Sequence, residues 1–513
     1  MFYPSPKQMK AIEDAADKAG VSYLQLMENA GARLAVFILE LISSGTVSGE
    51  TVILCGSGNN GGDGFVAARN LADVGKAVTV VIADKEPSTE LSAYEFCKLS
   101  ESSNINVLYL NDNINTVFSL FSSAGLIVDA VFGTGFHGEL PPALKACFSF
   151  ISRCPAKKLA VDVPSGGNCL TGEVADGTIK ADFTVCFAFR KVGMELYPLK
   201  QFCGNIVIED IGIPDELCNN VEYLLEDRNI NCISEIIPER KPCSHKGSFG
   251  KLLNISGCRC MSGAAALSTL AALRSGAGLV KLASAETVVN RIAASVFEAI
   301  YLPLKEASDG SISAENEDII TKEVKKHTAV SIGCGLSCNA DTKKITEKVL
   351  TEAECPIILD ADGINCIADN IDIIKNTKNK LIITPHAGEL GHLLGISAEE
   401  AVADRFSAAV KLSSIYKIVV VAKGVPTFVV GDGKAYLCRT GNPGLSRGGS
   451  GDVLTGIIAG FVTQGIPPLE AALAGVLVHG YCADRLKDKT SMLGMLPSDI
   501  INELPYVFGE LNR

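Results

Sequence analysis

Short apolar runs alternate with stretches of helical spacing through the first part of the chain. Two helices are expected between residues 5 and 42, and each later apolar run has the length of one buried strand. Apolar strands separated by helices are typical of a parallel sheet that is covered on both faces. The expected strands of this sheet are 51–55, 77–83, 126–130, 158–163, 183–187 and 204–208.

The alternation weakens between residues 214 and 240, where Pro214 and Pro238 are turn residues, and then resumes. A small-residue helix is expected at 263–276, and the chain is expected to be mostly helical from Gly448 onward. The 513 residues suffice for two or three domains of about 100–200 residues each. We therefore predict two α/β domains, 1–218 and 219–513. The expected strands of the second domain are 252–256, 329–333, 356–360, 380–384, 418–422 and 427–430.

Composition narrows the class of protein. Hydrophobic residues make up 47% of the chain and charged residues 20%, which allows large cores. The net charge of −12 argues against a general nucleic-acid binder, because such proteins have a basic surface. None of the 18 cysteines forms a C-x-x-C pair, so we expect reduced thiols and a reducing compartment. With no signal-peptide pattern and no membrane-spanning run, a soluble cytoplasmic protein is expected.

A glycine-rich turn, Gly448-Gly449-Ser450-Gly451-Asp452, precedes an apolar helical stretch. Free backbone N–H groups and the positive end of the helix dipole meet at such a point and can hold a phosphate. An aspartate is not needed for phosphate binding and repels it. Asp452 is therefore a candidate general base that takes a proton from a hydroxyl while the glycine amides hold the transferring phosphoryl group. The alternative is a simple helix N-cap, which Asp also favours.

A second glycine-rich turn follows the expected strand 51–55. It contains G-x-G-x-x-G at Gly56, Gly58 and Gly61, and Asp84 lies where a ribose-binding acid would be expected. A Rossmann-like domain follows, and a Rossmann dehydrogenase is one alternative. The turn holds more than that fingerprint needs, because its side chains at 59, 60 and 63 supply amides and carboxylate oxygens suited to a ribose, an amide or a cation.

Polar residues follow other expected strands, where ligands bind in α/β sheets. Asp129 precedes a Gly133-Thr134-Gly135-Phe136 segment, Asp162 precedes Pro164-Ser165-Gly166, and a third cluster begins at Lys191. The side chains of Asn60, Asp129 and Ser165 are hard oxygen donors without a thiolate or imidazole partner. Such a set suits an alkali or alkaline-earth ion.

The second domain has its own strand-end residues. Asp360 and Asp362 follow one strand, His386 and Glu389 another, and Lys423 a third. A histidine is more often a structural hydrogen-bonding residue, but the position of His386 beside Glu389 at a strand end favours a functional role. Asp360 could be structural, and Asp362 could cap a helix.

The first domain resembles the YjeF N-terminal family, the NAD(P)H-hydrate epimerases. The strings that carry the resemblance are GNNGGDG at 58–64, DAVFGTG at 129–135, DVPSG at 162–166 and ADFTV at 181–185. The resemblance implies that Asn60, Asp129 and Ser165 hold a potassium ion and that Asp162 takes part in catalysis. The residues implied to contact hydrated dinucleotide are Asn59, Asn60, Gly61, Gly62, Asp63, Gly133, Thr134, Gly135, Phe136, His137, Gly138, Glu139 and Asp162.

The second domain resembles the YjeF C-terminal family, ADP-dependent NAD(P)H-hydrate dehydratases with a ribokinase-like three-layer fold. The resemblance spans roughly residues 240–505 and implies that Gly335, His386 and Asp452 face the hydrated nicotinamide. The residues implied to bind ADP are Lys423, Gly424, Val425, Pro426, Thr427, Asn442, Gly444, Gly448, Gly449, Ser450 and Gly451.

Four residues depart from that family's pattern. Ser450 stands where Thr is usual, Cys334 and Ser337 replace a Pro and a Gly, and Arg447 occupies a small-residue position. Ser450 keeps the hydroxyl, so activity is expected, and Arg447 is expected to bear on nucleotide affinity.

Together the two resemblances imply a bifunctional repair enzyme for hydrated NADH and NADPH, NADHX and NADPHX. Its first domain would interconvert the R and S epimers, with K⁺, and its second would dehydrate the S epimer with ADP and Mg²⁺. We expect small-molecule substrates, a homo-oligomer, and no nucleic-acid or membrane partner. The alternatives are a ribokinase-like small-molecule kinase fused to a Rossmann-like domain, and a non-catalytic dinucleotide-binding or protein-interaction module.

Overall fold

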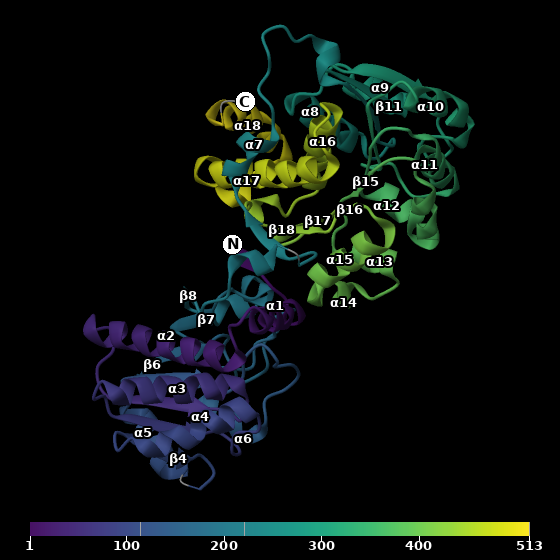
Figure 1. Cartoon of the computed structure of the whole chain (residues 1–513). Helices are drawn as coiled ribbons and strands as arrows, with labels where there is room; N and C mark the ends of the chain where they lie inside the picture. Colours follow the sequence, from purple (N-terminus) through teal and green to yellow (C-terminus); the bar gives the residue numbers. More distant parts are fainter. Residues whose placement is uncertain (113, 220, 512–513) are drawn as a thin grey trace. The chain divides into compact units, whose positions relative to one another are not determined.

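The structure is a computed structural model that describes residues 1–112, 114–219 and 221–511 (Figure 1). It divides into two compact units, Met1–Leu225 and Glu226–Arg513. The division falls close to the expected domain boundary after residue 218, inside the segment where the strand–helix alternation weakens. Each unit has its own sheet and its own hydrophobic core.

The N-terminal unit is built on a seven-stranded parallel sheet of order β4-β3-β2-β5-β6-β7-β8. Counted from β2, this is the Rossmann strand order with one added edge strand. All six expected strands form, within one or two residues at each end. The structure adds β4, which the apolar pattern missed because this edge strand is only half-buried. The strands are β2 (Thr51–Cys55), β3 (Val78–Ile82), β4 (Ile105–Tyr109), β5 (Leu126–Ala130), β6 (Lys157–Val161), β7 (Phe183–Phe187) and β8 (Asn205–Glu209).

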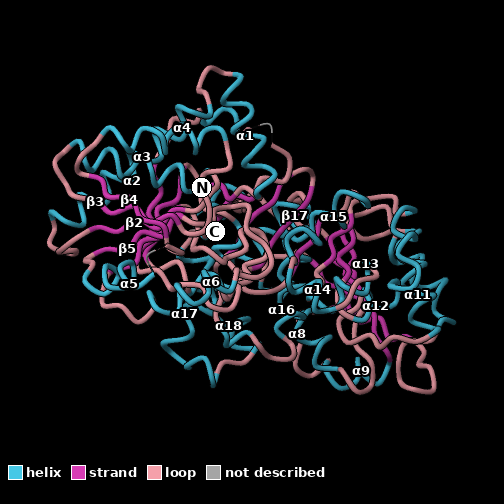
Figure 2. Tube along the Cα trace, turned by 90° about the horizontal axis from the view of Figure 1, so that it is seen from below, coloured by secondary structure: helices cyan, strands magenta, loops and turns pink. Residues whose placement is uncertain are grey.

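Helices cover both faces of this sheet (Figure 2). Successive residues of a strand point to opposite faces. Ile53 and Cys55 of β2 accordingly pack with α1, α2 and α3, whereas Val52 and Leu54 pack with α5 and α6. This double burial explains the continuous apolar runs in the sequence. The helices are α1 (Pro6–Lys18), α2 (Tyr23–Ser43), α3 (Asn59–Asp73), α4 (Glu90–Lys98), α5 (Ile114–Ser123) and α6 (Pro142–Ile151).

The C-terminal unit has a sheet of its own, which is mixed. Its strand order is β9-β18-β17-β16-β15-β14-β13-β10-β11-β12. Neighbouring strands from β12 to β16 are parallel, and β16, β17 and β18 are antiparallel. The expected strands all form. The strands are β9 (Leu225–Arg228), β10 (Lys251–Ile255), β11 (Leu279–Ala285), β12 (Ile300–Leu304), β13 (Ala329–Ile332), β14 (Ile357–Leu359), β15 (Leu381–Ile383), β16 (Val419–Ala422), β17 (Thr427–Gly431) and β18 (Lys434–Cys438).

Two helical layers enclose this sheet, so the ribokinase-like three-layer expectation is confirmed (Figure 1). One core joins the sheet to α8 (Ser262–Arg274), α16 (Ser450–Thr463), α17 (Pro468–Gly494) and α18 (Pro497–Glu510). On the other face α15 packs on β17 through Phe406 and Phe428, whose ring centroids are 5.3 Å apart. That layer contains α10 (Glu317–Val324), α11 (Ala340–Glu352), α12 (Asp362–Ile367), α13 (Ala387–Leu394), α14 (Ala398–Ala403) and α15 (Arg405–Tyr416). Helix α9 (Glu286–Ile292) packs against α8 on the first face.

Helix α16 packs closely against α8, and this contact fixes the position of its N-terminus. A Cβ atom at Gly456 would lie 2.3 Å from the Ser268 carbonyl oxygen, and one at Gly460 would lie 2.8 Å from that of Ala272. Side chains larger than hydrogen at these two positions would push the helices apart. The glycine-rich turn at Gly448 is therefore held at one place above the sheet.

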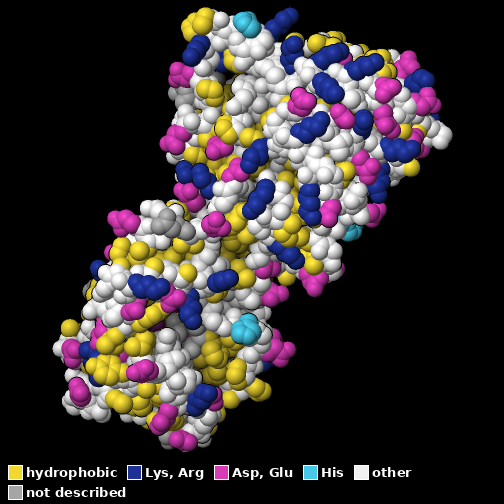
Figure 3. Space-filling model, turned by 45° about the vertical axis from the view of Figure 1, so that its right-hand side comes forward, with side chains coloured by type: hydrophobic (Ala, Val, Ile, Leu, Met, Phe, Trp, Pro, Cys, Tyr) yellow, Lys and Arg dark blue, Asp and Glu magenta, His cyan; other side chains and the backbone are white. Residues whose placement is uncertain are grey.

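The surface drawn in Figure 3 carries Lys and Arg side chains interspersed with Asp and Glu. All 18 cysteines are free thiols, and most are buried. Among the residues that the structure describes, no helix combines the length and the hydrophobicity that crossing a bilayer requires.

Candidate active sites

The N-terminal unit has a cavity of about 630 Å³ at the carboxyl ends of its central strands. Helix α3 begins at its edge, with Gly58 as N-cap. The segment from Asn59 to Asp63 is thus the first turn of a helix rather than the loop that its glycines suggest. This turn lies close to the strand end, because a Cβ at Gly61 would be 2.0 Å from the Gly56 carbonyl oxygen.

Most of the implied dinucleotide contacts line this cavity. Gly61, Gly62 and Gly138 are not among the described residues that line it, and Gly62 faces the Met27 side chain in the core. The implied contacts that do line the cavity are Asn59, Asn60, Asp63, Gly133, Thr134, Gly135, Phe136, His137, Glu139 and Asp162.

Asp162 and Lys191 form a buried ion pair beside the cavity. Asp162 directly follows β6 in a left-handed conformation, with φ of 65°, and its Oδ1 also accepts the Phe187 N–H at 3.3 Å. Burial lowers the pKa of Lys191, but Asp162 outweighs burial and raises that pKa above its ordinary value. The lysine therefore keeps its charge, and the carboxylate has a fixed place in the cavity wall.

Asp129 and Ser165 meet behind the cavity floor. The Ser165 hydroxyl donates to Asp129 Oδ1 at 2.5 Å, and the Ser165 backbone N–H donates to Oδ2 at 2.9 Å. Burial raises the pKa of Asp129, although the bonds from Ser165 act in the opposite direction. The third implied ligand, Asn60, lies against Gly133, where a Cβ would be 3.1 Å from its Oδ1, and its buried Nδ2 has no hydrogen-bond partner.

This donor set fits a potassium ion. Carboxylate, hydroxyl and amide oxygens are the hard ligands that such ions take. Rotation of the Asn60 amide by half a turn would also replace the unpartnered Nδ2 with an oxygen. Phe132 adds a nearby backbone carbonyl, which accepts from the Ser165 hydroxyl at 3.2 Å.

In the C-terminal unit, Asp360 joins the ends of several strands. Its Oδ1 accepts from Thr384 after β15 at 2.6 Å and from Lys423 after β16 at 2.9 Å. Its Oδ2 accepts from Thr455 of α16 at 2.8 Å. Burial raises the pKa of Asp360, but the charge of Lys423 and these hydrogen bonds outweigh it, so that pKa lies below its ordinary value. Asp360 is thus a buried, ionised carboxylate.

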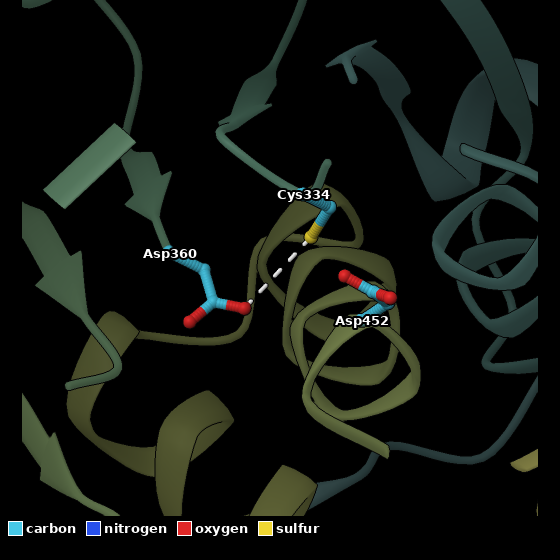
Figure 4. Close-up of side chains that lie close together, drawn as sticks. All are labelled: Cys334, Asp360 and Asp452. Atoms are coloured by element: carbon cyan, nitrogen blue, oxygen red, sulfur yellow. Dashed lines mark hydrogen bonds between the residues drawn. The ribbon is translucent and has the colours of Figure 1, made fainter. Parts of the chain in front are cut away.

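Asp452 lies close to Asp360 and Cys334 (Figure 4). Gly449, with φ of 98°, is the N-cap of α16, so Asp452 lies within the first turn and makes no capping bond. The alternative of a simple N-cap is therefore wrong for this residue. Burial and the neighbouring Asp360 raise the pKa of Asp452 to about 6, while a hydrogen bond from the Cys334 thiol opposes them. A carboxyl with this pKa is mostly deprotonated at neutral pH and can accept a proton.

Lys423 and the glycine-rich turn face the same space. A Cβ at Gly451 would lie 3.6 Å from Lys423 Nζ and 3.7 Å from Asp360 Oδ2. Burial lowers the pKa of Lys423, but Asp360 and Glu389 outweigh burial and raise it. The arrangement combines a fixed cation, helix N-terminal amides and the Asp452 carboxylate, which are the parts that hold and transfer a phosphoryl group.

The other implied nucleotide and nicotinamide residues have local structural roles as well. His386 caps α13, where its Nδ1 accepts the N–H groups of Gly388 and Glu389, and its ring is exposed. Asn442 accepts from Gly444 N–H at 3.0 Å and donates to Asp484 at 3.1 Å. The Thr427 hydroxyl donates to the Gly424 carbonyl at 3.0 Å, next to a cis Val425–Pro426 bond.

Two of the four departures from the family pattern, Ser337 and Arg447, make hydrogen bonds of their own. The Ser337 backbone N–H donates to Asp362 at 2.7 Å, and Ser337 tolerates φ of 67°. The Arg447 guanidinium donates to the Leu493 carbonyl near the end of α17. Gly335, which has φ of 60°, lies against Met261 and Ala264 of the α8 end.

Comparison with known proteins matches both halves. The sequence model of the NAD(P)H-hydrate dehydratase family matches residues 252–506, and that of the YjeF-related protein N-terminus matches 23–193. The bifunctional NAD(P)H-hydrate repair enzyme Nnr of Moorella thermoacetica is 32% identical, over 97% of this chain and 95% of its own length. The Thermofilum pendens enzyme of the same name is 33% identical, over 96% and 93%.

The chain belongs to the bifunctional NAD(P)H-hydrate repair enzymes.

Among solved structures, the ADP/ATP-dependent NAD(P)H-hydrate dehydratase of Bacillus subtilis, co-crystallised with ATP and Mg²⁺, is 31% identical to this chain. It covers 56% of this chain and 99% of its own length, with a TM-score of 0.49.

Membership of the NAD(P)H-hydrate repair enzymes confirms the expected family and excludes a Rossmann dehydrogenase as the identity of the first unit. Among the described residues that line the cavity, two charged residues were not assigned a role by the motifs. Lys191 was noted only as the start of a strand-end cluster, and Glu13 of α1 was missed. A signal for Glu13 exists in the sequence, because it shares a helix face with Met9, Ile12 and Ala16, which are buried.

Proposed function

We propose that this chain repairs hydrated NADH and NADPH in two steps. Its N-terminal unit interconverts the R and S epimers, and its C-terminal unit converts the S epimer back to NAD(P)H with ADP. The observation that carries the proposal is the position of Asp452, a carboxylate in the first turn of a glycine-rich helix that faces Lys423. Family membership supports the pairing of the two activities.

In the dehydratase site, the oxygen of the ring hydroxyl attacks the terminal phosphoryl group of ADP. Asp452 accepts the proton of that hydroxyl during the attack. The amides of the Gly448–Gly451 turn and the Lys423 ammonium stabilise the charge that develops on that group. AMP leaves. The C–O bond of the ring phosphate ester then breaks, phosphate departs, and the adjacent ring carbon loses a proton to solvent, which restores the double bond. Magnesium is proposed to accompany the nucleotide, as it does with ATP in the B. subtilis structure.

In the epimerase site, Asn60, Asp129 and Ser165 would hold potassium, which when bound supplies positive charge next to the substrate. The Asp162 carboxylate, fixed by Lys191, is proposed to contact the reacting ring and to be catalytic. The wall from Gly133 to Glu139 and the turn from Asn59 to Asp63 are proposed to hold the dinucleotide. The cavity volume of about 630 Å³ lies within the usual range for small-molecule sites.

The absorbance of reduced nicotinamide tests the proposal directly. Purified protein with mixed NADHX epimers, K⁺, Mg²⁺ and ADP should restore this absorbance completely, because the epimerase supplies S epimer as it is consumed. The same assay with ATP compares the two nucleotides. A stable phosphorylated product without recovered absorbance would indicate a small-molecule kinase, and no nucleotide-dependent change would indicate a binding module.

The two activities should be separable. The compact units divide between Leu225 and Glu226, and each has its own sheet and core. Fragments 1–218 and 219–513, expressed apart, should each be folded and keep one activity, measured by circular dichroism and by the two assays. Fragments that are insoluble alone and active only when co-expressed would contradict separability.

A cytoplasmic, homo-oligomeric enzyme without nucleic-acid or membrane partners is also proposed. The net negative charge of the chain and the mixture of basic and acidic side chains in Figure 3 support the proposal that nucleic acid is not a partner. Light scattering of the purified protein tests the oligomeric state, and a monomeric mass would remove that part of the proposal.

A further inference from the structure

Helix α1 brings a carboxyl group into the epimerase cavity that neither motif nor resemblance includes. Glu13 lines the cavity together with Asp63, Asp162 and Lys191. It precedes residues 23–193, the segment that the YjeF-related family matches. The family resemblance therefore assigns no role to the Glu13 carboxyl, although this group lines the cavity.

The position of Glu13 is well fixed. Met9, Ile12 and Ala16 bury one face of α1 in the core, and Ser5 and Gln8 close a capping box at its start. The Gln8 side chain also donates to the Glu222 carbonyl at 3.0 Å. Residues that act in proton transfer are best placed on such rigid elements.

The acidic groups of the cavity differ in their surroundings. The Asp162 carboxylate is held in a buried ion pair with Lys191. Burial, with Asp162 and Glu13 nearby, raises the pKa of Asp63 well above its ordinary value. Burial and then Asp162 raise the pKa of Glu13 to about 7. The titratable and charged groups around Glu13 are Lys10, Asp14, Tyr23, Asp63, Asp162 and Lys191.

The proposed reaction needs a group that both gives and takes a proton. Hydration of reduced nicotinamide leaves a hydroxyl on the ring carbon next to the ring nitrogen. Protonation of that hydroxyl breaks the C–O bond, water leaves, and the nitrogen lone pair forms a C=N⁺ double bond. Water then adds to the opposite face, the C=N⁺ electrons return to nitrogen, and a carboxylate accepts the proton from the added water. No oxidant or further reactant is required.

We propose that Glu13 is the catalytic acid and base at this ring hydroxyl, and that Asp162 is the carboxylate on the opposite side. Starting from one epimer, protonated Glu13 gives its proton to the leaving hydroxyl and Asp162 accepts one from the incoming water. In the reverse direction the two groups exchange roles. After the turnover Glu13 takes a proton from solvent and Asp162 releases one to solvent, so both groups return to their starting state. This inference rests on the proposed epimerase function of the unit.

The test uses the full chain without nucleotide, so that dehydration does not remove the S epimer. Chromatography follows the conversion of pure R epimer of NADHX to the mixture as a function of pH. Wild type should show a rate change centred near the pKa of Glu13, about 7. Glu13→Gln should lower kcat about 10²–10⁴-fold and remove that inflection, since the amide keeps the shape but cannot exchange a proton. Asp17→Asn, an exposed carboxylate on the same helix, is the matched control and should behave as wild type.

The outcomes separate this inference from the function on which it rests. Wild type that does not interconvert the epimers overturns the proposed function itself. An active wild type with a flat profile across neutral pH, or a Glu13→Gln protein that keeps its rate, overturns the role of Glu13. A Glu13→Gln protein that is slow but keeps the wild-type inflection has lost only packing, and this also overturns it. Thermal melting of each variant shows whether the helix is still in place.

Discussion

Asp452→Asn should bind ADP about as well as the wild type and lose about 10²–10⁴-fold in dehydratase turnover, which is the usual effect of removing a general base. The amide has nearly the same shape and leaves the Gly448–Gly451 amides and Lys423 in place. It cannot accept the proton of the ring hydroxyl. Calorimetric ADP affinity and the turnover of S-NADHX, measured on the same preparation, test this expectation.

The pH profile gives an independent check of the same residue. Because burial and Asp360 raise the pKa of Asp452 to about 6, wild-type dehydration should fall as pH decreases through that value, where the base becomes protonated. The residual rate of Asp452→Asn should lack this inflection. Asp488→Asn, an exposed carboxylate of α17, serves as control. A fully active Asp452→Asn enzyme would remove Asp452 from the mechanism.

Asp129→Ala should abolish conversion of the R to the S epimer and leave dehydration of the S epimer intact. The substitution removes the only charged member of the implied potassium set and leaves the Ser165 hydroxyl and N–H without their partner. Epimerisation is measured without nucleotide, and dehydration with pure S epimer and ADP.

Asp73→Ala, at the exposed end of α3, is the matched control for this prediction. Potassium itself provides the second arm: replacing K⁺ with Li⁺ should slow wild-type epimerisation and have no further effect on Asp129→Ala. Normal epimerisation by Asp129→Ala would show that the ion site is assigned wrongly.

Strands buried on both faces could be predicted from the sequence because their apolar runs are continuous. The sequence did not predict β4, β9, β11, β12 or β18, and three of these break that pattern for physical reasons. The edge strand β4 is half-buried, β11 contains Lys281 and Ser284, and β12 contains Pro303. The first turn of α3 was not predicted because glycine disfavours helix. Here position 61 must be glycine, because a side chain there would collide with the Gly56 carbonyl oxygen.

Site residues could be predicted from the sequence where one local segment identifies them. Asp452, Asp129 and Asp162 follow strands or begin a helix, so the strand–turn–helix pattern points to them. Glu13 could not be found in this way, because its role depends on a helix that folds over the cavity from outside the motif-bearing segments. The N-cap alternative for Asp452 could be decided only once the start of α16 was known.

The several hydrogen bonds to Asp360 bear on how natural variants of this protein are interpreted. A substitution at Asp360 would leave the buried Lys423 ammonium without its nearest anion and would free the hydroxyls of Thr384 and Thr455. Breaking a buried ion pair from one side costs about 3–5 kcal/mol, a large share of the stability of a domain. Part of the loss of repair caused by such a variant would therefore reflect less folded protein, and a low-temperature or stabilising condition should recover that part. Variants at Asp452 would not respond in this way.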